Sequence, residues 1–351
     1  MSDKTALLNL SHEQLTSLLM SWGEPRFRAA QVWRWLYRNQ ADDPAQMANL
    51  PRPLRERLLA ETSVTALPVV ASDLADAGQT EKVAFRTADG QVIESVLMRY
   101  TNRTTVCVSS QIGCPVGCLF CATGRAGFVR DLSTAEISAQ VLYFSRQLQH
   151  ENAHVTNVVF MGMGEPMLNF EAVWQAILNL HERDGLALGI RRFTLSTVGI
   201  VPGIEVLARE GLAVGLAISL HAPSDALRNR LIPVNRRYPL ARLLEAVRFY
   251  IERTGRRVTF EYALADGVND SDEQAVATAG LLRGLLAHVN LIQMNEVEGV
   301  QMRPSSRERV LRFQDVLQQQ GIQTTVRVSR GADIQAACGQ LRSRIADESE
   351  Q

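Results

Sequence analysis

Three of the five cysteines of this 351-residue chain lie in the stretch Cys114-Pro115-Val116-Gly117-Cys118-Leu119-Phe120-Cys121, at spacings of four and three residues. The stretch follows a β-rich run and is therefore expected on the loop after a strand. Three thiolates this close together favour a soft metal centre. A four-iron cluster bound by three cysteines keeps one iron without a protein ligand, where a substrate can bind. A closed zinc site needs four ligands, and no histidine or fourth cysteine lies at zinc-finger spacing, so the cysteines favour an iron-sulfur cluster.

Around this loop, short β-rich runs alternate with amphipathic helical stretches. Such alternation implies parallel strands joined by crossover helices, and we expect an α/β fold with an open or partly closed barrel. The predicted strands are Thr105–Ser110, Val155–Gly162, Arg192–Thr197, Ala213–Leu220, Val258–Leu264, Val289–Met294 and Thr324–Ser329. The predicted helices are Ser133–Gln149, Phe170–Arg183, Leu240–Arg253, Asp272–Leu286 and Ser305–Gln320, with a shorter one after Pro202.

Upstream of the barrel, the pattern is helical from Leu10 to about Leu59 and includes a capping box formed by Ser11 and Gln14. Alternating residues then surround Asp89-Gly90, a dipeptide typical of a tight hairpin turn. We therefore expect a helical accessory domain over residues 1–75, a hairpin and linker over 76–103, the α/β core over 104–345 and a tail over 346–351.

The overall composition excludes several classes of protein. A hydrophobic content of 46% excludes extensive disorder, and 37 basic residues balance 37 acidic ones, so net charge gives no argument for binding nucleic acid. The longest apolar run, Gly211–Leu220, has about half the length of a membrane-spanning helix. The first residues lack the basic and then apolar layout of a secretory signal. We expect a cytoplasmic protein without a membrane partner, in which cysteines point to metal or redox chemistry.

Glycine and polar residues follow several predicted strands at their carboxyl ends, the edge at which barrel enzymes assemble their sites. Individually, each is more often part of a turn, a cap or a structural contact. Their common position on one rim favours a shared site. These residues are Gly162-Met163-Gly164-Glu165-Pro166, Ser196-Thr197, Ser219-Leu220-His221 and Asn295.

The cysteine stretch resembles the signature of the radical S-adenosylmethionine (SAM) enzymes, including the aromatic residue before the last cysteine. From about Leu10 to Leu341 the chain resembles one branch, the RlmN/Cfr-type RNA adenine methyltransferases. Two positions, Gln335 and the pair Gln293-Met294, depart from the pattern of that branch. The matching motifs are Cys107-Val108-Ser109-Ser110-Gln111, Gly162 to Leu168, Ser219-Leu220-His221-Ala222-Pro223, Gly267-Val268-Asn269-Asp270 and Asp333-Ile334-Gln335-Ala336-Ala337-Cys338-Gly339-Gln340-Leu341.

The resemblance implies a radical-SAM type partial parallel (β/α) barrel and two cofactors. One 4Fe-4S cluster would be bound by Cys114, Cys118 and Cys121, and SAM would chelate the open iron, with two SAM molecules consumed per turnover. The electron would come from a donor such as a flavodoxin or ferredoxin. The implied SAM contacts are Gly164, Glu165, Ser196, Ser219, Leu220, His221 and Asn295.

The resemblance also implies roles for three further residues. Cys338 would take a methyl group from one SAM, and a radical from the second SAM would activate that methyl for addition to an electron-poor ring carbon of adenine. Cys107 would then resolve the covalent RNA–protein link as a disulfide forms, and Glu94 would accept a proton. Without the resemblance, Cys107 is a small buried residue on a strand and Glu94 a polar position on a hairpin. A radical route is chemically reasonable, because the ring carbon is not nucleophilic enough for direct transfer.

The implied substrates are an adenosine of 23S ribosomal RNA, methylated at carbon 2, and the adenosine next to the anticodon of some transfer RNAs. One alternative is the same mechanism at carbon 8, as in the antibiotic-resistance branch. A second alternative is a non-catalytic RNA-binding protein with a structural metal. The segment from Arg228 to Arg257 holds nine arginines and is either a phosphate-binding patch or a salt-bridged surface. The arginines and aromatic residues of the helical N-terminal unit, including Trp33 and Tyr37, either dock RNA or form a core.

Overall fold

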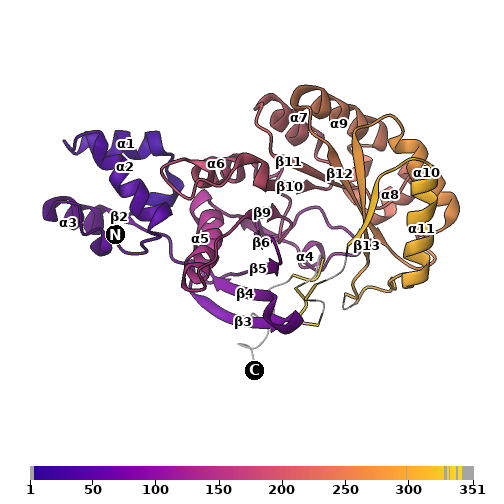
Figure 1. Cartoon of the computed structure of the whole chain (residues 1–351), viewed down its shortest axis with the longest axis horizontal. Coiled ribbons are helices and arrows are strands. Elements are labelled where there is room, and N and C mark those ends of the chain that lie inside the picture. The colour runs from indigo at the N-terminus through magenta and orange to yellow at the C-terminus, as the bar shows by residue number, and fades with distance from the viewer. Residues whose placement is uncertain (1–3, 298, 328–329, 332, 337–338, 342–351) are drawn as a thin grey trace.

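The computed structural model describes residues 4–297, 299–327, 330–331, 333–336 and 339–341, and a ten-stranded sheet forms the centre of this part of the chain (Figure 1). The strand order is β14-β13-β12-β11-β10-β9-β6-β5-β4-β3, and all neighbours from β6 to β14 are parallel. The predicted α/β class with a partial parallel barrel is confirmed. The parallel strands are β6 (Arg103–Cys107), β9 (Asn157–Phe160), β10 (Phe193–Thr197), β11 (Gly215–Ser219), β12 (Val258–Leu264), β13 (Ala287–Gln293) and β14 (Thr324–Arg327).

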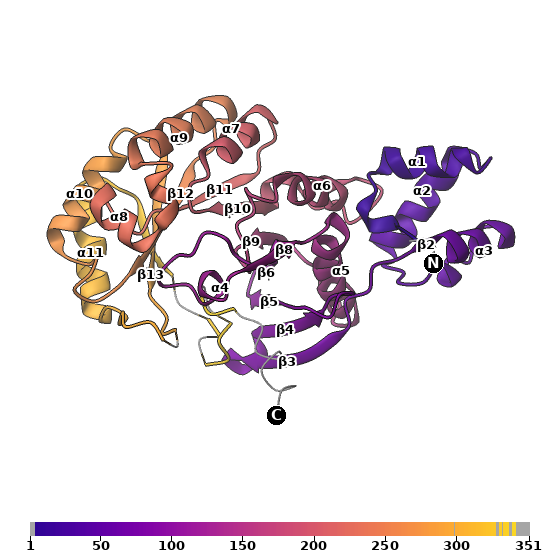
Figure 2. The ribbon, with the colours of Figure 1, turned by 180° about the vertical axis from the view of Figure 1, so that it is seen from behind.

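Helices connect the parallel strands and lie along the outside of the sheet (Figure 2). Ser133 and Glu136 form a capping box at the start of α5, and Gly255 ends α9 in the left-handed region, with φ +63°. In the described residues, no helix is long and apolar enough to cross a membrane. The helices that connect the parallel strands are α5 (Thr134–His150), α6 (Phe170–His181), α7 (Val201–Arg209), α8 (Asp225–Leu231), α9 (Leu240–Thr254), α10 (Asp272–Leu282) and α11 (Arg307–Gln319).

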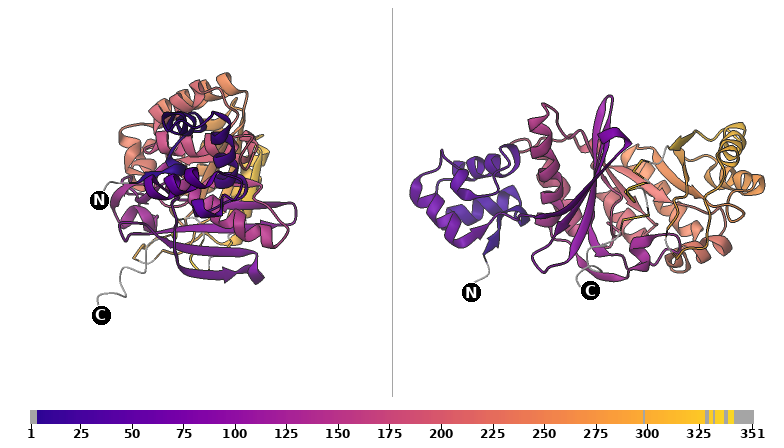
Figure 3. Two further views of the ribbon diagram at one scale, coloured as in Figure 1. Left: turned by 90° about the vertical axis from the view of Figure 1, so that its left-hand side faces the viewer. Right: turned by 90° about the horizontal axis from the view of Figure 1, so that it is seen from below.

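An antiparallel extension continues the sheet beyond β6. The predicted hairpin forms as β4 (Thr80–Arg86) and β5 (Val92–Tyr100), and β5 pairs with β6. β3 (Val69–Ala75) pairs with β4, although the sequence pattern groups it with the helical N-terminal unit. The hairpin and β3 therefore extend the parallel sheet at its β6 edge, and the view from below shows these strands beside α5 (Figure 3).

The N-terminal unit contains α1 (His12–Ser21), α2 (Phe27–Trp33), α3 (Arg52–Glu61) and a short parallel pair, β1 (Thr5–Ala6) and β2 (Thr62–Ser63). It contacts α5 and α6: the Asn179 side chain of α6 donates to the Tyr37 hydroxyl at 3.0 Å. Trp33 and Tyr37 are fully buried, and their rings stack at 4.4 Å between centroids. These two aromatic side chains are thus core residues. Of the two roles considered for them, core packing is the one that the structure shows.

Candidate active site

The three clustered cysteines lie on a long loop that leaves and re-enters the fold through a small antiparallel pair, β7 (Gln111–Gly113) and β8 (Phe128–Asp131). Gly113 adopts φ +72°, and a Cβ atom there would lie 1.9 Å from the carbonyl oxygen of Gly127, so only glycine permits this approach of the two backbones. Between the two strands, the loop contains the cysteines and the short helix α4 (Ala122–Arg125).

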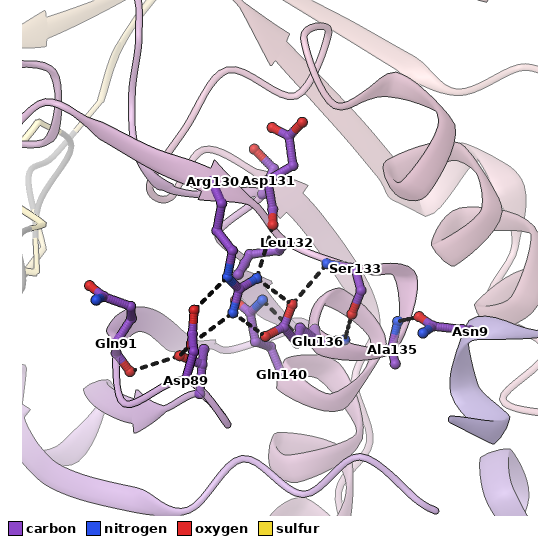
Figure 4. Close-up of polar contacts among 12 residues, drawn as sticks. Asn9, Asp89, Gln91, Arg130, Asp131, Leu132, Ser133, Ala135, Glu136 and Gln140 are labelled. Carbon is purple, nitrogen blue, oxygen red and sulfur yellow. Dashed lines mark hydrogen bonds and ion pairs between the residues drawn. The ribbon is translucent and has the colours of Figure 1, made fainter. Parts of the chain in front are cut away.

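Arg130 anchors the returning end of this loop. Figure 4 shows its guanidinium between Asp89 in the turn of the β4–β5 hairpin and Glu136 in the first turn of α5, with hydrogen bonds of 2.8–3.0 Å to each carboxylate. The guanidinium holds the pKa of Glu136 below its ordinary value, against the opposing effect of burial. The hairpin, the loop and α5 are thereby fixed to one another.

The cysteine side chains line one cavity together with Phe120. Burial raises the pKa of Cys114 to about 12 and raises that of Cys118 well above its ordinary value. Among the described residues, no three His, Cys, Asp or Glu side chains are arranged around a single metal ion. In a four-iron cluster each thiolate binds a different iron, so thiols that surround a cavity fit that cofactor.

The Gly162–Glu165 segment after β9 forms the next wall of the cavity. A Cβ atom at Gly162 would lie 2.6 Å from the carbonyl oxygen of Val108, and one at Gly164 would lie 2.5 Å from Cβ of Gln111. The Gln111 side chain accepts a hydrogen bond from the backbone N–H of Glu165 at 2.8 Å. Both glycines are thus required for the close contact between this segment and the start of the cysteine loop.

Glu165 is one of two buried glutamates that line the cavity. Its carboxylate accepts hydrogen bonds from the backbone N–H groups of Met167 at 3.0 Å and Val198 at 2.8 Å. Burial raises its pKa to about 7, with these hydrogen bonds opposing the rise. Near neutral pH the group is therefore poised to become a full negative charge when a cation enters the cavity.

His221 connects the cysteine loop to the strand ends. Its Nδ1 accepts the backbone N–H of Ala263 at 2.9 Å, and its ring meets Phe120 edge-to-face at 4.9 Å. Burial lowers its pKa to about 3, so the imidazole is neutral at physiological pH. The Asn269 amide donates to the carbonyl oxygens of His221 and Ala263, which gives the Gly267–Asp270 motif a structural role.

Six of the seven predicted SAM contacts line the cavity, and the seventh does not. Leu220 is fully buried and does not line the cavity: its N–H donates to the backbone carbonyl oxygen of Glu261, and its own carbonyl oxygen accepts from Arg228. The six that line the cavity are Gly164, Glu165, Ser196, Ser219, His221 and Asn295.

Two charged residues of the cavity were not singled out from the sequence. Glu261 on β12 and Arg327 on β14 both line it, and the Asn290 amide donates to Glu261 at 3.0 Å. Burial raises the pKa of Glu261, whereas Arg327 lowers it. A glutamate within the otherwise apolar strand Val258–Leu264 was the available signal, because charge on a buried strand is costly without a purpose or a partner.

Glu94 and Cys107 lie on one face of the sheet. Val96 is directly opposite Cys107, and Glu94 is two residues from Val96, so both side chains project to the same side. Both residues are buried. The Lys82 ammonium lies 3.4 Å from the Glu94 carboxylate and 3.5 Å from Asp73, on the same face.

Cys338 lies outside the described residues, but the chain on both sides of it is described. Gln335 lines a second cavity together with Glu94 and Lys82. Gly339 lines the cavity of the three cysteines, and its carbonyl oxygen accepts the backbone N–H of Ala122 at 2.8 Å. The segments that flank Cys338 therefore contact both groups of predicted site residues.

The arginine-rich segment does not lie at the surface throughout. Arg228 is fully buried, and Arg242 pairs with Glu245 at 2.7 Å on the exposed side of α9. The sequence left two interpretations of this segment, a phosphate-binding patch and a salt-bridged surface. Arg242 fits the salt-bridged surface, whereas Arg228 fits neither.

Comparisons with known proteins agree with this geometry. A model described as the radical SAM superfamily matches residues 108–279, and one described as the ribosomal RNA large subunit methyltransferase N-terminal domain matches residues 5–64. The chain is 51% identical to a probable dual-specificity RNA methyltransferase RlmN of Chloroflexus aurantiacus, over 97% of this chain and 94% of that one. It is 48% identical to a protein of the same description from Symbiobacterium thermophilum, over 96% and 91%.

Among solved structures, a radical SAM methyltransferase from Sphaerobacter thermophilus superposes with a TM-score of 0.94, at 51% identity, covering 97% of this chain and 100% of that chain. Identity at this level extends through the cysteine loop, the barrel and the N-terminal unit. The chain therefore belongs to the RlmN family of radical SAM RNA methyltransferases.

Proposed function

We propose that this protein methylates carbon 2 of an adenosine in 23S ribosomal RNA, and of the adenosine next to the anticodon of some transfer RNAs, by way of a methyl group carried on Cys338. Membership of the family supports RNA as the substrate class and SAM with an iron-sulfur cluster as cofactors. The observation that carries the proposal is that the two segments flanking Cys338 line two cavities: Gly339 lines the cavity of the three cysteines, and Gln335 lines the cavity of Glu94.

The cluster would be bound by Cys114, Cys118 and Cys121. Together with SAM it supplies one-electron and radical chemistry when bound, and a small redox protein such as a flavodoxin or ferredoxin supplies the electron. The three thiols lose their protons on binding, because the thiolate is the metal ligand. Cys118 is buried, whereas Cys114 and Cys121 are half-buried, so the cavity remains accessible to SAM.

For SAM, the residues of the cavity have distinct tasks. Glu165 offers a carboxylate to the ammonium group of SAM, and the ionised form is stabilised by its two backbone N–H donors. Ser196, Ser219 and Asn295 offer hydroxyl and amide groups along the strand ends. His221, neutral and hydrogen-bonded to Ala263, orients Phe120 and carries no charge that would compete with Glu165.

Cys107 and Glu94 complete the reaction on the RNA. The Cys107 thiolate attacks the sulfur of Cys338, so that an S–S bond forms and the bond between that sulfur and the former methyl carbon breaks. The electron pair of the broken bond stays with that carbon, which takes up a proton and remains on the base as the methyl group. Glu94 would receive the proton that leaves the ring carbon, and the one electron that the radical adduct has to lose would return to the cluster. For the base to reach these residues it has to leave its stack, so loops, bulges and unfolded RNA are preferred over a perfect duplex.

The first test is mass spectrometry of nucleosides. Protein-free ribosomal RNA, and in parallel transfer RNA, is incubated anaerobically with reconstituted enzyme, SAM and reductant. We expect 2-methyladenosine in both. The product 8-methyladenosine would refute the choice of carbon and favour the other branch, and neither product from enzyme with an intact cluster would overturn the proposed reaction.

A second test addresses the roles of the two remaining cysteines. Cys107→Ala is expected to accumulate a covalent RNA–protein adduct, and the double variant with Cys338→Ala is expected to form none. Denaturing gel electrophoresis with labelled RNA measures both. Turnover by Cys107→Ala without an adduct would contradict the role of Cys107.

The ligand assignment is tested by Cys114→Ala, Cys118→Ala and Cys121→Ala. Each variant is expected to lose the brown absorption of the reconstituted protein, whereas Cys107→Ala retains it and serves as the matched control. Full colour in all three variants would remove the proposed cluster site.

A further inference from the structure

Arg228 is the largest charged side chain that is fully buried in the described part of the chain. It lies on α8, directly after the Ser219–Pro223 segment of the cavity wall. From the sequence alone it belonged to a group of arginines around α9. In the fold it is separated from solvent, so its charge acts within the protein and not on a phosphate at the surface.

The guanidinium binds four acceptors that carry no charge. Its Nε donates to the carbonyl oxygen of Leu220 at 3.1 Å, and Nη1 donates to the side chain of Asn235 at 2.6 Å. Nη2 donates to the carbonyl oxygens of Val198 at 2.5 Å and Ser219 at 2.9 Å. Val198 and Ser219 line the cavity, so this one side chain connects the ends of β10 and β11 beneath it.

The carboxylate of Asp225 stabilises the Arg228 cation electrostatically, but its hydrogen bonds go to other groups. Asp225 accepts hydrogen bonds from Asn235 at 2.8 Å and from the backbone N–H of Leu240 at 2.9 Å. Burial lowers the pKa of Arg228 to about 10, so the side chain is still a cation at pH 7. A buried charge is costly unless opposite charge compensates it, and here every group hydrogen-bonded to the guanidinium is neutral, so the compensation from Asp225 leaves room for a further negative charge.

The cavity cysteines provide the place for that compensating charge. Cys118 packs in a small apolar cluster with Leu231 and Ile232, at the end of α8, and the Leu119 N–H donates to the Leu231 carbonyl oxygen at 3.0 Å. Val198 and Ser219, whose carbonyl oxygens accept from Arg228, line the same cavity as Cys118. Apolar surroundings strengthen an interaction between opposite charges, because the local dielectric constant is low.

We propose that Arg228 is a positioning residue that stabilises the reduced form of the cluster bound at Cys114, Cys118 and Cys121, and thereby raises its reduction potential. The inference rests on the cluster assignment within the proposed function, but on no assumption about the RNA. A four-iron cluster with three thiolates carries a net negative charge, and one-electron reduction adds another. A fixed cation behind Cys118 favours the more negative state.

The test is an anaerobic redox titration of the reconstituted protein without SAM or RNA, with the reduced cluster monitored by electron paramagnetic resonance. We expect Arg228→Gln to lower the ratio of reduced to oxidised cluster at a fixed potential by at least tenfold, which corresponds to a 59 mV lower midpoint for a one-electron couple. Arg228→Lys keeps the charge and is expected to stay within threefold of the parent protein. Arg242→Gln, an exposed arginine on α9, is the control and leaves the midpoint unchanged.

A second neutral variant, Arg228→Met, separates charge from hydrogen bonding, and circular dichroism establishes that each variant is folded. Loss of the cluster from both folded neutral variants, beside an Arg228→Lys variant that holds it, would assign Arg228 to cluster binding and overturn the proposed effect on the reduction potential. Unchanged midpoints in both neutral variants, or an equal loss in Arg228→Lys and Arg228→Gln, would overturn it. Absence of any cluster from the parent protein would instead refute the proposed function.

Discussion

Replacing Glu165 by glutamine removes a buried carboxyl group whose ionisation differs between the folded and unfolded chain. In the folded protein burial raises its pKa to about 7, from an ordinary value of 4.5. The unfolded chain therefore ionises first as the pH rises. The folded state loses stability relative to the unfolded state between these two values, and the loss is complete above pH 7.

The size of the effect follows from the two pKa values. A difference from 4.5 to about 7 corresponds to a loss of about 3 kcal/mol, of which about 2.5 kcal/mol falls between pH 5 and pH 8. Glutamine does not titrate. The free energy of unfolding of Glu165→Gln minus that of the parent protein should therefore rise by about 2.5 kcal/mol across this interval.

The assay is urea denaturation of the metal-free, reduced protein, followed by circular dichroism at several pH values from 5 to 8. The neighbouring thiols do not interfere, because burial raises the pKa of Cys114 to about 12. Glu171→Gln, at the exposed start of α6, is the matched control. A difference between Glu165→Gln and the parent that stays constant across the range would refute the reasoning, as would one that falls with rising pH.

Three further outcomes are expected. Gly164→Ala should abolish SAM binding by the reconstituted protein, measured by calorimetry, because the new Cβ atom would lie 2.5 Å from Cβ of Gln111 on β7. Gly280→Ala is the control: its Cβ atom would have no atom within 4 Å, so this variant should bind SAM normally, and its free energy of unfolding should rise by about 0.5–1 kcal/mol. Lys82→Met should slow release of the RNA adduct, measured by gel, because the Glu94 carboxylate loses its ion pair; unchanged release would contradict this. Arg130→Met should lower the free energy of unfolding by about 2 kcal/mol in urea denaturation, and a loss near zero would show that its carboxylate contacts contribute little.

The elements of the barrel were predictable because their signals are local. Val258–Leu264 forms β12 with the predicted bounds, since a short apolar run between polar segments is typical of a strand buried on both faces. Ser133 and Glu136 start α5 through hydrogen bonds within four residues of chain. β3 was not predicted, because its partner β4 and not its own pattern makes it a strand of the main sheet.

The site was predictable in part for the same reason. Cysteine spacing and the position of polar residues at the ends of strands are visible along the chain, and six of the seven predicted SAM contacts line the cavity. Leu220 follows the same rim yet points away from it. Glu261 and Arg327 belong to strands far apart in the sequence, so their proximity to one cavity depends on how the sheet closes.

The sequence alone thus predicts the cysteine loop, the alternation of strands and helices, and the edge of the sheet at which the site residues lie. Each of these features depends on residues that are close together in the chain. Burial and pairing depend on segments that meet only after folding. The arginine pattern around α9 did not distinguish Arg228, whose guanidinium joins β10 to β11 beneath the cavity, from Arg242, which lies at the surface. The tertiary fold makes this distinction, because the cost of burying a charge is set by the surrounding atoms and not by the sequence neighbours of the residue.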